Sequence, residues 1–245
     1  MTSECIHGFE SMQCDICFPA AAPTRPAARR APASRPSRRE SPVRASSPAV
    51  STGETRIHLV LSIDDLSRAL DAAAIGAELS VVNALASDLG RELRESAEIA
   101  GRPATSFVSF SLTPEGGAWA QLRGGASEPQ WSDRARKATP ADFVVLVSTL
   151  ARVGEDAVVA DGDASGSGTR LAYTPEDVRR MLGRLREDPA ARDAAEVLVP
   201  GEVPFETIQL IGVANDPAKE RVRAILAAHG TPTRVAVYPP WFAVD

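Results

Sequence analysis

A proline-rich tract divides this chain and limits which residues can share a hydrophobic core. Residues 19–55 consist largely of Pro, Ala, Ser and Arg, and no hydrophobic period runs through them. Such a tract cannot bury enough apolar surface to offset the entropy lost on ordering, so we expect a disordered linker. The sequence therefore predicts three parts: a short segment over residues 1–18, the linker over 19–55, and a globular domain over 56–245.

The predicted linker is strongly basic. It carries seven arginines against Glu40 and Glu54, a net charge of +5, whereas the whole chain has a net charge of −5. A basic arm of this kind can hold nucleic acid or an acidic partner electrostatically. It can equally serve as a solubilising spacer, and the sequence leaves both interpretations open.

All three cysteines of the chain lie in the short N-terminal segment. Cys5 and His7 form a C-x-H pair, Cys14 and Cys17 form a C-x-x-C pair, and six residues separate His7 from Cys14. Three thiolates and one imidazole are the ligand mixture of closed structural zinc sites. The alternative is burial of small apolar side chains, which so short and polar a segment cannot readily provide. We therefore expect structural zinc, without an open position for catalysis.

The composition and the lengths of the apolar runs indicate where in the cell we expect the protein. The chain has 44% hydrophobic but only 5% aromatic residues, which is typical of an alanine-rich globular protein. Its apolar runs fall short of the roughly 20 residues that a membrane span requires, and its N-terminus has no basic start followed by an apolar stretch. We expect no membrane segment and a cytoplasmic location, where thiolates stay reduced.

From Arg56 onward, hydrophobic periodicity predicts an α+β domain. Apolar, β-branched runs predict strands at residues 56–62, 106–112, 142–150, 156–162, 207–214 and 233–242. Helical periods with start or stop signals predict helices at residues 63–74, 82–97, 174–188 and 216–230. Because strands and helices alternate irregularly, we expect a mixed sheet with flanking helices rather than a doubly wound parallel sheet.

Common catalytic motifs are missing from this domain. It contains neither G-x-x-x-x-G-K nor G-x-S-x-G, and "DGDASGSGTR" does not fit the dinucleotide fingerprint. A Cys-His dyad is excluded because every cysteine precedes residue 18. His229 stands at the end of a predicted helix, where the helix dipole favours its charge, so we interpret it as structural.

Several polar residues stand beside apolar runs and are candidates for a ligand site. Glu196 precedes an apolar run that we expect to be a buried strand, and Asp161 and Asp163 follow another strand. Thr169 and Arg170 close the Gly-rich loop, and Arg91 and Arg94 lie on the predicted helix 82–97. A carboxylate facing arginines suits an anionic ligand, but the same residues also fit a solvated surface.

The order of several short motifs resembles one known family. The runs "DFVVLVSTL", "VVADGDASGSGTRLAYTPEDV", "AAEVLVPGEVP", "TIQLIGVA" and "TRVAVYPPWF" occur in the order found in the DarT-type ADP-ribosyltransferases. The resemblance spans roughly Ile57 to Phe242. It implies an ADP-ribosyltransferase-like mixed sheet and transfer of ADP-ribose from NAD to thymine in single-stranded DNA. It also implies a toxin whose antitoxin is a macrodomain.

The resemblance assigns roles to particular residues. Glu196 matches the catalytic glutamate of the family, and a carboxylate there would stabilise the oxocarbenium-like ribose that develops as the nicotinamide bond breaks. Arg94, with Arg91 close behind, would hold the NAD pyrophosphate, because a planar guanidinium makes paired hydrogen bonds to phosphate. His58 resembles a nucleotide-binding histidine of the first strand, and Asp161, Thr169 and Arg170 complete the predicted cofactor contacts.

Two questions stay open at this point. If Asp65 and Leu66 are held in the family's register, the histidine position falls on Leu59, and His58 then points to the opposite face of the strand. The chain is either an active transferase or a catalytically weak or inactive family member that serves as a zinc-tethered binding or regulatory module. An active enzyme requires Glu196, an arginine and His58 to line one cleft.

Overall fold

The computed structural model describes residues 52–244. The predicted zinc ligands Cys5, His7, Cys14 and Cys17 and most of the predicted linker lie outside the described residues. The features below therefore belong to the predicted globular domain.

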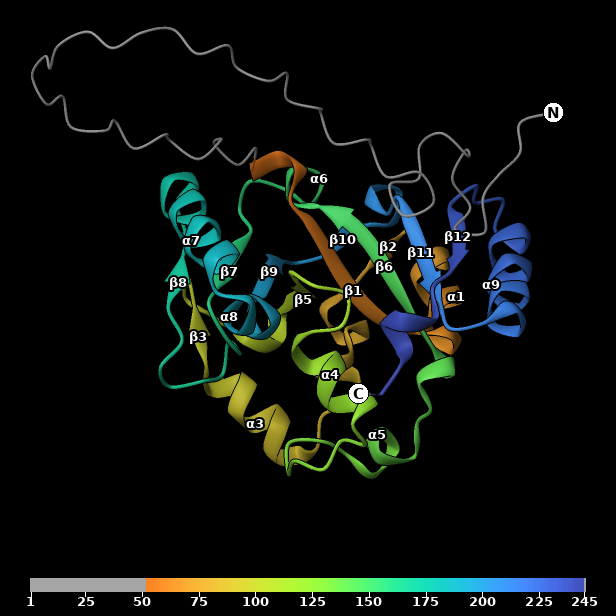
Figure 1. Cartoon of the computed structure of the whole chain (residues 1–245), viewed down its shortest axis with the longest axis horizontal. Coiled ribbons are helices and arrows are strands. Elements are labelled where there is room, and N and C mark those ends of the chain that lie inside the picture. The colour runs from red at the N-terminus through yellow and green to blue at the C-terminus, as the bar shows by residue number, and fades with distance from the viewer. Residues whose placement is uncertain (1–51, 245) are drawn as a thin grey trace, which may run out of the picture. The chain divides into compact units, whose positions relative to one another are not determined.

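An eight-stranded sheet runs through the centre of this domain (Figure 1). Its strand order is β12-β11-β6-β1-β5-β9-β7-β8. Strands β11 and β12 pair in parallel and the other neighbours pair antiparallel, so the sheet is mixed, as predicted. The strands are β1 (Arg56–Ser62), β5 (Phe107–Ser111), β6 (Phe143–Thr149), β7 (Val158–Ala160), β8 (Leu171–Ala172), β9 (Glu196–Pro200), β11 (Leu210–Val213) and β12 (Arg234–Val237).

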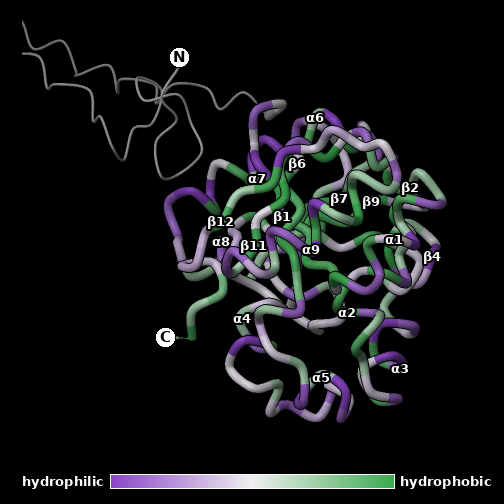
Figure 2. Tube along the Cα trace, turned by 90° about the vertical axis from the view of Figure 1, so that its right-hand side faces the viewer, coloured by the Kyte–Doolittle hydropathy of each residue, from purple (hydrophilic) through white to green (hydrophobic). Residues whose placement is uncertain are grey.

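One face of the sheet packs against three long helices. Side chains that alternate along the strands, such as Leu59 and Leu61 of β1 and Val197 and Val199 of β9, form the largest core cluster. The long helices that contribute to it are α1 (Ile63–Asp71), α7 (Pro175–Glu187) and α9 (Asp216–Ala228), and the short α6 (Leu150–Val153) adds Leu150 and Val153. Figure 2 shows the hydrophobic colouring concentrated on the strands and the hydrophilic colouring on the outer helices and loops.

The opposite face carries two smaller clusters instead of one. Val60 and Val145 pack with Trp119 and Trp131 in one cluster, and Leu198 belongs to the other. Shorter helices cover the first cluster and the rim of this face. The remaining helices are α2 (Val81–Ala84), α3 (Asp88–Ser96), α4 (Gly117–Arg123), α5 (Asp133–Lys137) and α8 (Pro189–Ala194).

Short elements complete the described chain. Two small sheets join β2 (Ala74–Ile75) with β10 (Val203–Pro204) and β3 (Glu98–Ile99) with β4 (Arg102–Pro103). Six 3₁₀ turns lie at Thr52–Glu54, Ala77–Leu79, Ala104–Ser106, Pro140–Asp142, Phe205–Thr207 and Pro239–Phe242.

Side-chain caps explain where the long helices begin. Ser62 accepts a hydrogen bond from the Asp64 amide at the start of α1, and Thr174 accepts one from Asp177 at the start of α7. Each cap satisfies one of the four backbone N–H groups that a helix leaves free at its N-terminus. The predicted starts of both helices are confirmed.

The sequence was wrong about the region between β1 and β6. The predicted helix 82–97 is two helices, because Ser87 accepts from the Gly90 amide and starts α3 as a separate element. The sequence also missed α4 and α5 in this region, and α8 before β9. These helices are only five to seven residues long, too short to show a helical hydrophobic period.

Gly90 sets how closely α3 approaches the segment before α5. A Cβ placed there would lie 2.3 Å from the Gln130 carbonyl oxygen, a backbone atom that cannot move aside cheaply. An alanine in a helix is usually more stable than glycine by about 1 kcal/mol, but here the overlap should outweigh that gain.

We therefore expect Gly90→Ala to lower the free energy of unfolding by about 1–3 kcal/mol. The matched control is Gly183→Ala in α7, where a Cβ would meet no atom within 4 Å. That variant should stabilise the protein by about 0.5–1 kcal/mol. Urea unfolding of both variants checks the prediction, and an unaffected Gly90→Ala protein would contradict the close packing of α3.

Candidate active site

A row of polar side chains crosses the sheet between the two smaller clusters. His58 of β1 is paired with Ser111 of β5, and Ser111 is paired with Glu196 of β9. Directly paired residues of antiparallel strands point to the same face, so all three side chains leave the sheet together. His58 therefore lies on the face of Glu196, while Leu59 and Leu61 lie in the core on the other face.

Arg94 of α3 reaches down onto this row. Its Nη1 and Nη2 lie 3.4 and 3.5 Å from the two carboxylate oxygens of Glu196, and Nη1 lies 3.5 Å from an oxygen of Asp163. Arg94 and Glu196 are only 5% and 6% exposed, whereas the Asp163 side chain is 56% exposed. A guanidinium facing both oxygens of one carboxylate fixes the orientation of both side chains.

Burial changes the ionisation of Glu196. Loss of hydration raises the pKa of its carboxyl above the ordinary value, and the nearby Asp163 carboxylate adds to this. The Arg94 guanidinium and a hydrogen bond from Ser109 act in the opposite direction. Since desolvation is the largest contribution, the pKa of Glu196 stays above its usual range, as is common for carboxyls in enzyme active sites.

His58 is held neutral at the other end of the row. It is 6% exposed, and burial lowers its pKa to about 4, although a hydrogen bond with the Ser111 backbone opposes the shift. The charges of Arg56 and Arg192 lower it further. Its ring lies edge-on to Trp241, with 6.0 Å between ring centroids.

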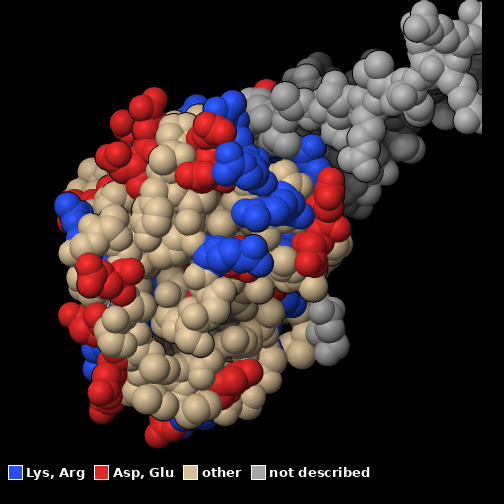
Figure 3. Space-filling view, turned by 90° about the vertical axis from the view of Figure 1, so that its left-hand side faces the viewer, with Lys and Arg blue, Asp and Glu red and all other residues tan. Residues whose placement is uncertain are grey.

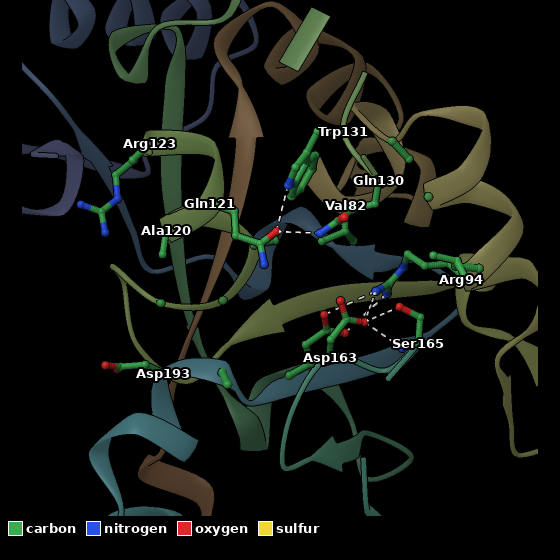
Figure 4. A pocket seen from close by; sticks show the side chains of 18 of the residues that line it. Val82, Arg94, Ala120, Gln121, Arg123, Gln130, Trp131, Asp163, Ser165 and Asp193 are labelled. Carbon is green, nitrogen blue, oxygen red and sulfur yellow. Dashed lines mark hydrogen bonds and ion pairs between the residues drawn. The ribbon is translucent and has the colours of Figure 1, made fainter. Parts of the chain in front are cut away.

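Arg94 and Glu196 line a cleft of about 630 Å³. In Figure 4, Arg94, Asp163 and Ser165 lie on one side of it, and Gln121, Trp131 and Val82 lie on the other. A smaller pocket lined by His58 and Ser111 adjoins the cleft and shares Glu196 with it. The volume is within the range of small-molecule sites, roughly 300–1,000 Å³.

The loop between β7 and β8 supplies Asp163 and Ser165 to the cleft. Asp161 clamps its base, because one carboxylate oxygen accepts from the Arg170 amide at 2.7 Å and the other lies 3.2 Å from the Arg170 Nε. The Thr169 hydroxyl donates to the Asp163 carbonyl at 2.6 Å. Asp161, Thr169 and Arg170 therefore hold the loop and do not line the cleft.

The structure separates the two arginines that the sequence placed together. Arg94 lies in the cleft, but Arg91 is on another side of α3, with its side chain 59% exposed and 3.0 Å from Asp88. Within residues 52–244 no group of three or more metal-ligating side chains comes together. The arrangement brings together Glu196, Arg94 and His58, and it leaves Arg91 outside.

Sequence reasoning missed part of the cleft wall. Gln121 and Trp131 come from a region without a clear hydrophobic period, so nothing in the sequence marked them. Asp163 had a signal, because it lies in the polar loop after a buried strand next to Asp161. Of the two carboxylates in this loop, Asp163 faces the cleft and Asp161 lies at the base of the loop.

A mixed sheet that places a buried glutamate and an arginine in a small-molecule cleft is compatible with an ADP-ribosyltransferase-type domain. The family model described as ssDNA thymidine ADP-ribosyltransferase, DarT, matches residues 91–243. The chain therefore belongs to this family. It is an NAD-dependent ADP-ribosyltransferase that acts on single-stranded DNA.

Several solved structures share the fold. Thermus sp. 2.9 DarT in complex with ADP-ribosylated ssDNA is 21% identical, has a TM-score of 0.63, and matches over 77% of this chain and 96% of its own. The same Thermus protein in complex with NAD+ is 21% identical, with a TM-score of 0.57 and coverage of 77% and 98%. Thermosipho africanus DarTG in complex with ADP-ribose is 17% identical, with a TM-score of 0.56 and coverage of 77% and 51%.

Two comparisons give negative findings. Curated protein sequences yield no significant match to this chain. Among residues 52–244, no helix combines the length and apolar character needed to cross a membrane.

The depressed pKa of His58 predicts an acid-sensitive fold. The unfolded chain takes up a proton at His58 near pH 6.5, but the folded chain does so only near pH 4. Stability should therefore be complete above pH 6.5 and should fall as the pH drops toward 4. The shift corresponds to a loss of about 3 kcal/mol.

Replacing the imidazole with a group that does not titrate should remove this contribution to the pH dependence of stability. We expect the stability difference between wild type and His58→Asn to shrink by about 3 kcal/mol from pH 7 to pH 4. Urea unfolding of both proteins at several pH values measures it. A constant difference across this window would show that His58 is not held neutral.

Proposed function

We propose that the cleft holds NAD and a thymine base of single-stranded DNA, and that Glu196 is the catalytic residue for transfer of ADP-ribose between them. The observation that carries this proposal is the Arg94–Glu196 pair, a buried carboxylate whose two oxygens face one guanidinium at the floor of a cleft. The Thermus DarT complexes with NAD+ and with ADP-ribosylated ssDNA support the same pair of substrates.

The chemistry requires a negative charge at Glu196. The bond between the ribose anomeric carbon and nicotinamide breaks, its electron pair leaves with the nicotinamide, and the carbon bonds to the base, which gives up a proton. Positive charge develops on the ribose during this step. An ionised Glu196 in a poorly hydrated cleft stabilises that charge more strongly than water would.

We propose that Arg94 positions Glu196. The sequence assigned it to the NAD pyrophosphate, but its guanidinium faces Glu196 and Asp163. A buried carboxylate without a cation takes up a proton more readily, so Arg94 favours the ionised form of Glu196 as well as its orientation. Arg94 Nε is buried and has no hydrogen-bond partner among the described residues.

The remaining predicted contacts divide into direct and indirect ones. His58 borders the pocket next to Glu196, and we propose that it contacts the nucleotide as a neutral ring. We propose that Asp161, Thr169 and Arg170 act indirectly, by holding the loop that presents Asp163. Arg91 is left without a proposed contact to NAD.

Exposed arginines offer a path for the DNA backbone. Helices α7 and α8 carry exposed side chains at Arg179, Arg184, Arg186 and Arg192, and the end of α8 lines the cleft. Figure 3 shows Lys and Arg side chains gathered on the side of the domain where these helices lie, with acidic side chains around them. We propose that this ridge neutralises phosphates of the single strand, despite the net negative charge of the chain.

For residues 1–55, the proposal rests on the sequence. We propose that Cys5, His7, Cys14 and Cys17 bind structural zinc, that residues 19–55 link this segment to the enzyme domain, and that the antitoxin is a macrodomain. The ligand set and its spacing support the first point, and the family resemblance supports the last.

Glu196→Gln tests the proposed role of the carboxylate. The change keeps the shape but removes the charge, so NAD should still bind while transfer to thymine-containing single strands falls by about a hundredfold or more. Transfer of labelled ADP-ribose and NAD binding by calorimetry measure the two effects. Undiminished transfer would refute the assignment, and absence of transfer in wild type as well would favour the binding-module alternative.

Metal analysis tests the proposed zinc site. The full chain, prepared without chelator, should carry about one zinc per chain, because the four ligands form one closed set. The double variant Cys14→Ser, Cys17→Ser should lose the metal, since hydroxyls do not replace thiolates as soft ligands. Elemental analysis decides the question, and a wild-type chain without zinc would rule the site out.

A further inference from the structure

The wall of the cleft opposite Asp163 carries an amide whose orientation is fixed by its neighbours. The Trp131 indole Nε1 donates to Gln121 Oε1 at 2.8 Å, and Gln130 Nε2 donates to the same oxygen at 3.2 Å. An indole N–H can only donate, so the Gln121 atom it contacts must be the oxygen. The Gln121 NH₂ group then points away from Trp131.

This NH₂ group is available to a ligand. Gln121 lines the cleft and is half-buried, and its Nε2 has no hydrogen-bond partner among residues 52–244. In Figure 4 the nitrogen of Gln121 points into the open part of the cleft, while its oxygen faces Trp131 and Gln130. Because the oxygen is already satisfied, Gln121 presents donors only and selects a ligand atom that accepts.

The support for Gln121 is rigid. Trp131 is 3% exposed, and its neighbour Ser132 donates its amide to the Leu85 carbonyl at 3.0 Å. The Gln130 carbonyl accepts from the Ser87 amide at 2.8 Å, at the start of the helix that carries Arg94. The segment that orients Gln121 is therefore tied to the helix that positions Glu196.

The two walls of the cleft suit different parts of the substrates. Nicotinamide in NAD is a cationic ring, and it is favoured beside the carboxylates of Asp163 and Glu196. Thymine is neutral and flat, and it is favoured beside Val82, Ala118 and Trp131 on the wall of Gln121. A thymine carbonyl accepts hydrogen bonds, whereas the amino group of cytosine at the equivalent position donates.

We propose that Gln121 is a specificity-determining residue, whose amide NH₂ donates to the C4 carbonyl oxygen of the acceptor base and so favours thymine over cytosine, which carries an amino group there. This inference rests on the proposed function of the cleft. Binding of the base can be measured separately from transfer of ADP-ribose to it. A failure of this inference can therefore be distinguished from a failure of the proposed function.

The first test removes the acceptor from the substrate and the donor from the protein. Gln121→Glu keeps an oxygen for Trp131 and Gln130 but replaces the NH₂ with a second acceptor. Oligonucleotides contain one thymine, 2-thiothymine or 4-thiothymine, since sulfur is a weak acceptor. Wild type should lose about tenfold in kcat/KM for 4-thiothymine but not for 2-thiothymine, while Gln121→Glu should discriminate less than about twofold between thymine and 4-thiothymine. A loss for 2-thiothymine alone would overturn the proposal, because cytosine carries the same C2 carbonyl.

Three further measurements make the result specific. Gln121→Glu should lower kcat/KM for thymine by about tenfold and should lower NAD cleavage in the absence of DNA by clearly less than that. Gln209→Glu, which adds the same charge at an exposed position away from the cleft, should behave as wild type. Gln121→Met, which removes the donor without adding charge, provides a second variant if Gln121→Glu does not fold.

A binding assay separates this proposal from the proposed function. Fluorescence anisotropy measures the binding of the three oligonucleotides in the presence of NAD. It compares the Glu196→Gln variant with the double variant that carries both Glu196→Gln and Gln121→Glu. If wild type transfers nothing to DNA, the proposed function fails, and this assay still decides the role of Gln121. Equal discrimination between oxygen and sulfur in both proteins would overturn the proposal, and so would a loss in NAD cleavage as large as the loss in transfer.

Discussion

The buried ion pair between Arg94 and Glu196 is the interaction on which the rest of the site depends. It ties α3 to the central sheet, because one partner lies on the helix and the other begins strand β9. Burying either charge alone costs far more than burying the pair. The close approach of α3 at Gly90 and the anchoring of the segment around Gln130 hold the helix that carries Arg94, and Asp163 lies 3.5 Å from its guanidinium.

The cleft exists because hydrophobic packing on one face of the sheet is interrupted. The opposite face forms one continuous core with α1, α7 and α9, which makes the sheet a rigid platform. On the cleft face, the row of His58, Ser111 and Glu196 stands between two separate clusters. A continuous core on this face would leave no room for a ligand, whereas two clusters give the cleft firm walls.

The walls of the cleft present opposite chemistry. Carboxylates stand on one side, and an apolar wall with a single oriented amide stands on the other. A transferase that joins a cationic donor to a neutral base needs this asymmetry, because each substrate must be recognised without displacing the other. The orientation of Gln121 is set by Trp131, so specificity depends on a residue that is itself buried.

The sequence by itself determined the periodic parts of this protein. The apolar runs of β1 and β6, the Thr174 and Ser62 caps, and a glutamate at the start of a buried strand are local patterns, and each is where the sequence predicted it. Tertiary structure decided the rest. Arg91 and Arg94 are alike in sequence, and only packing of α3 on the sheet buries one of them. Pairing of β1 with β5 put His58 on the face of Glu196, and a buried indole fixed the amide of Gln121, because contacts between distant segments leave no periodic signal in the chain.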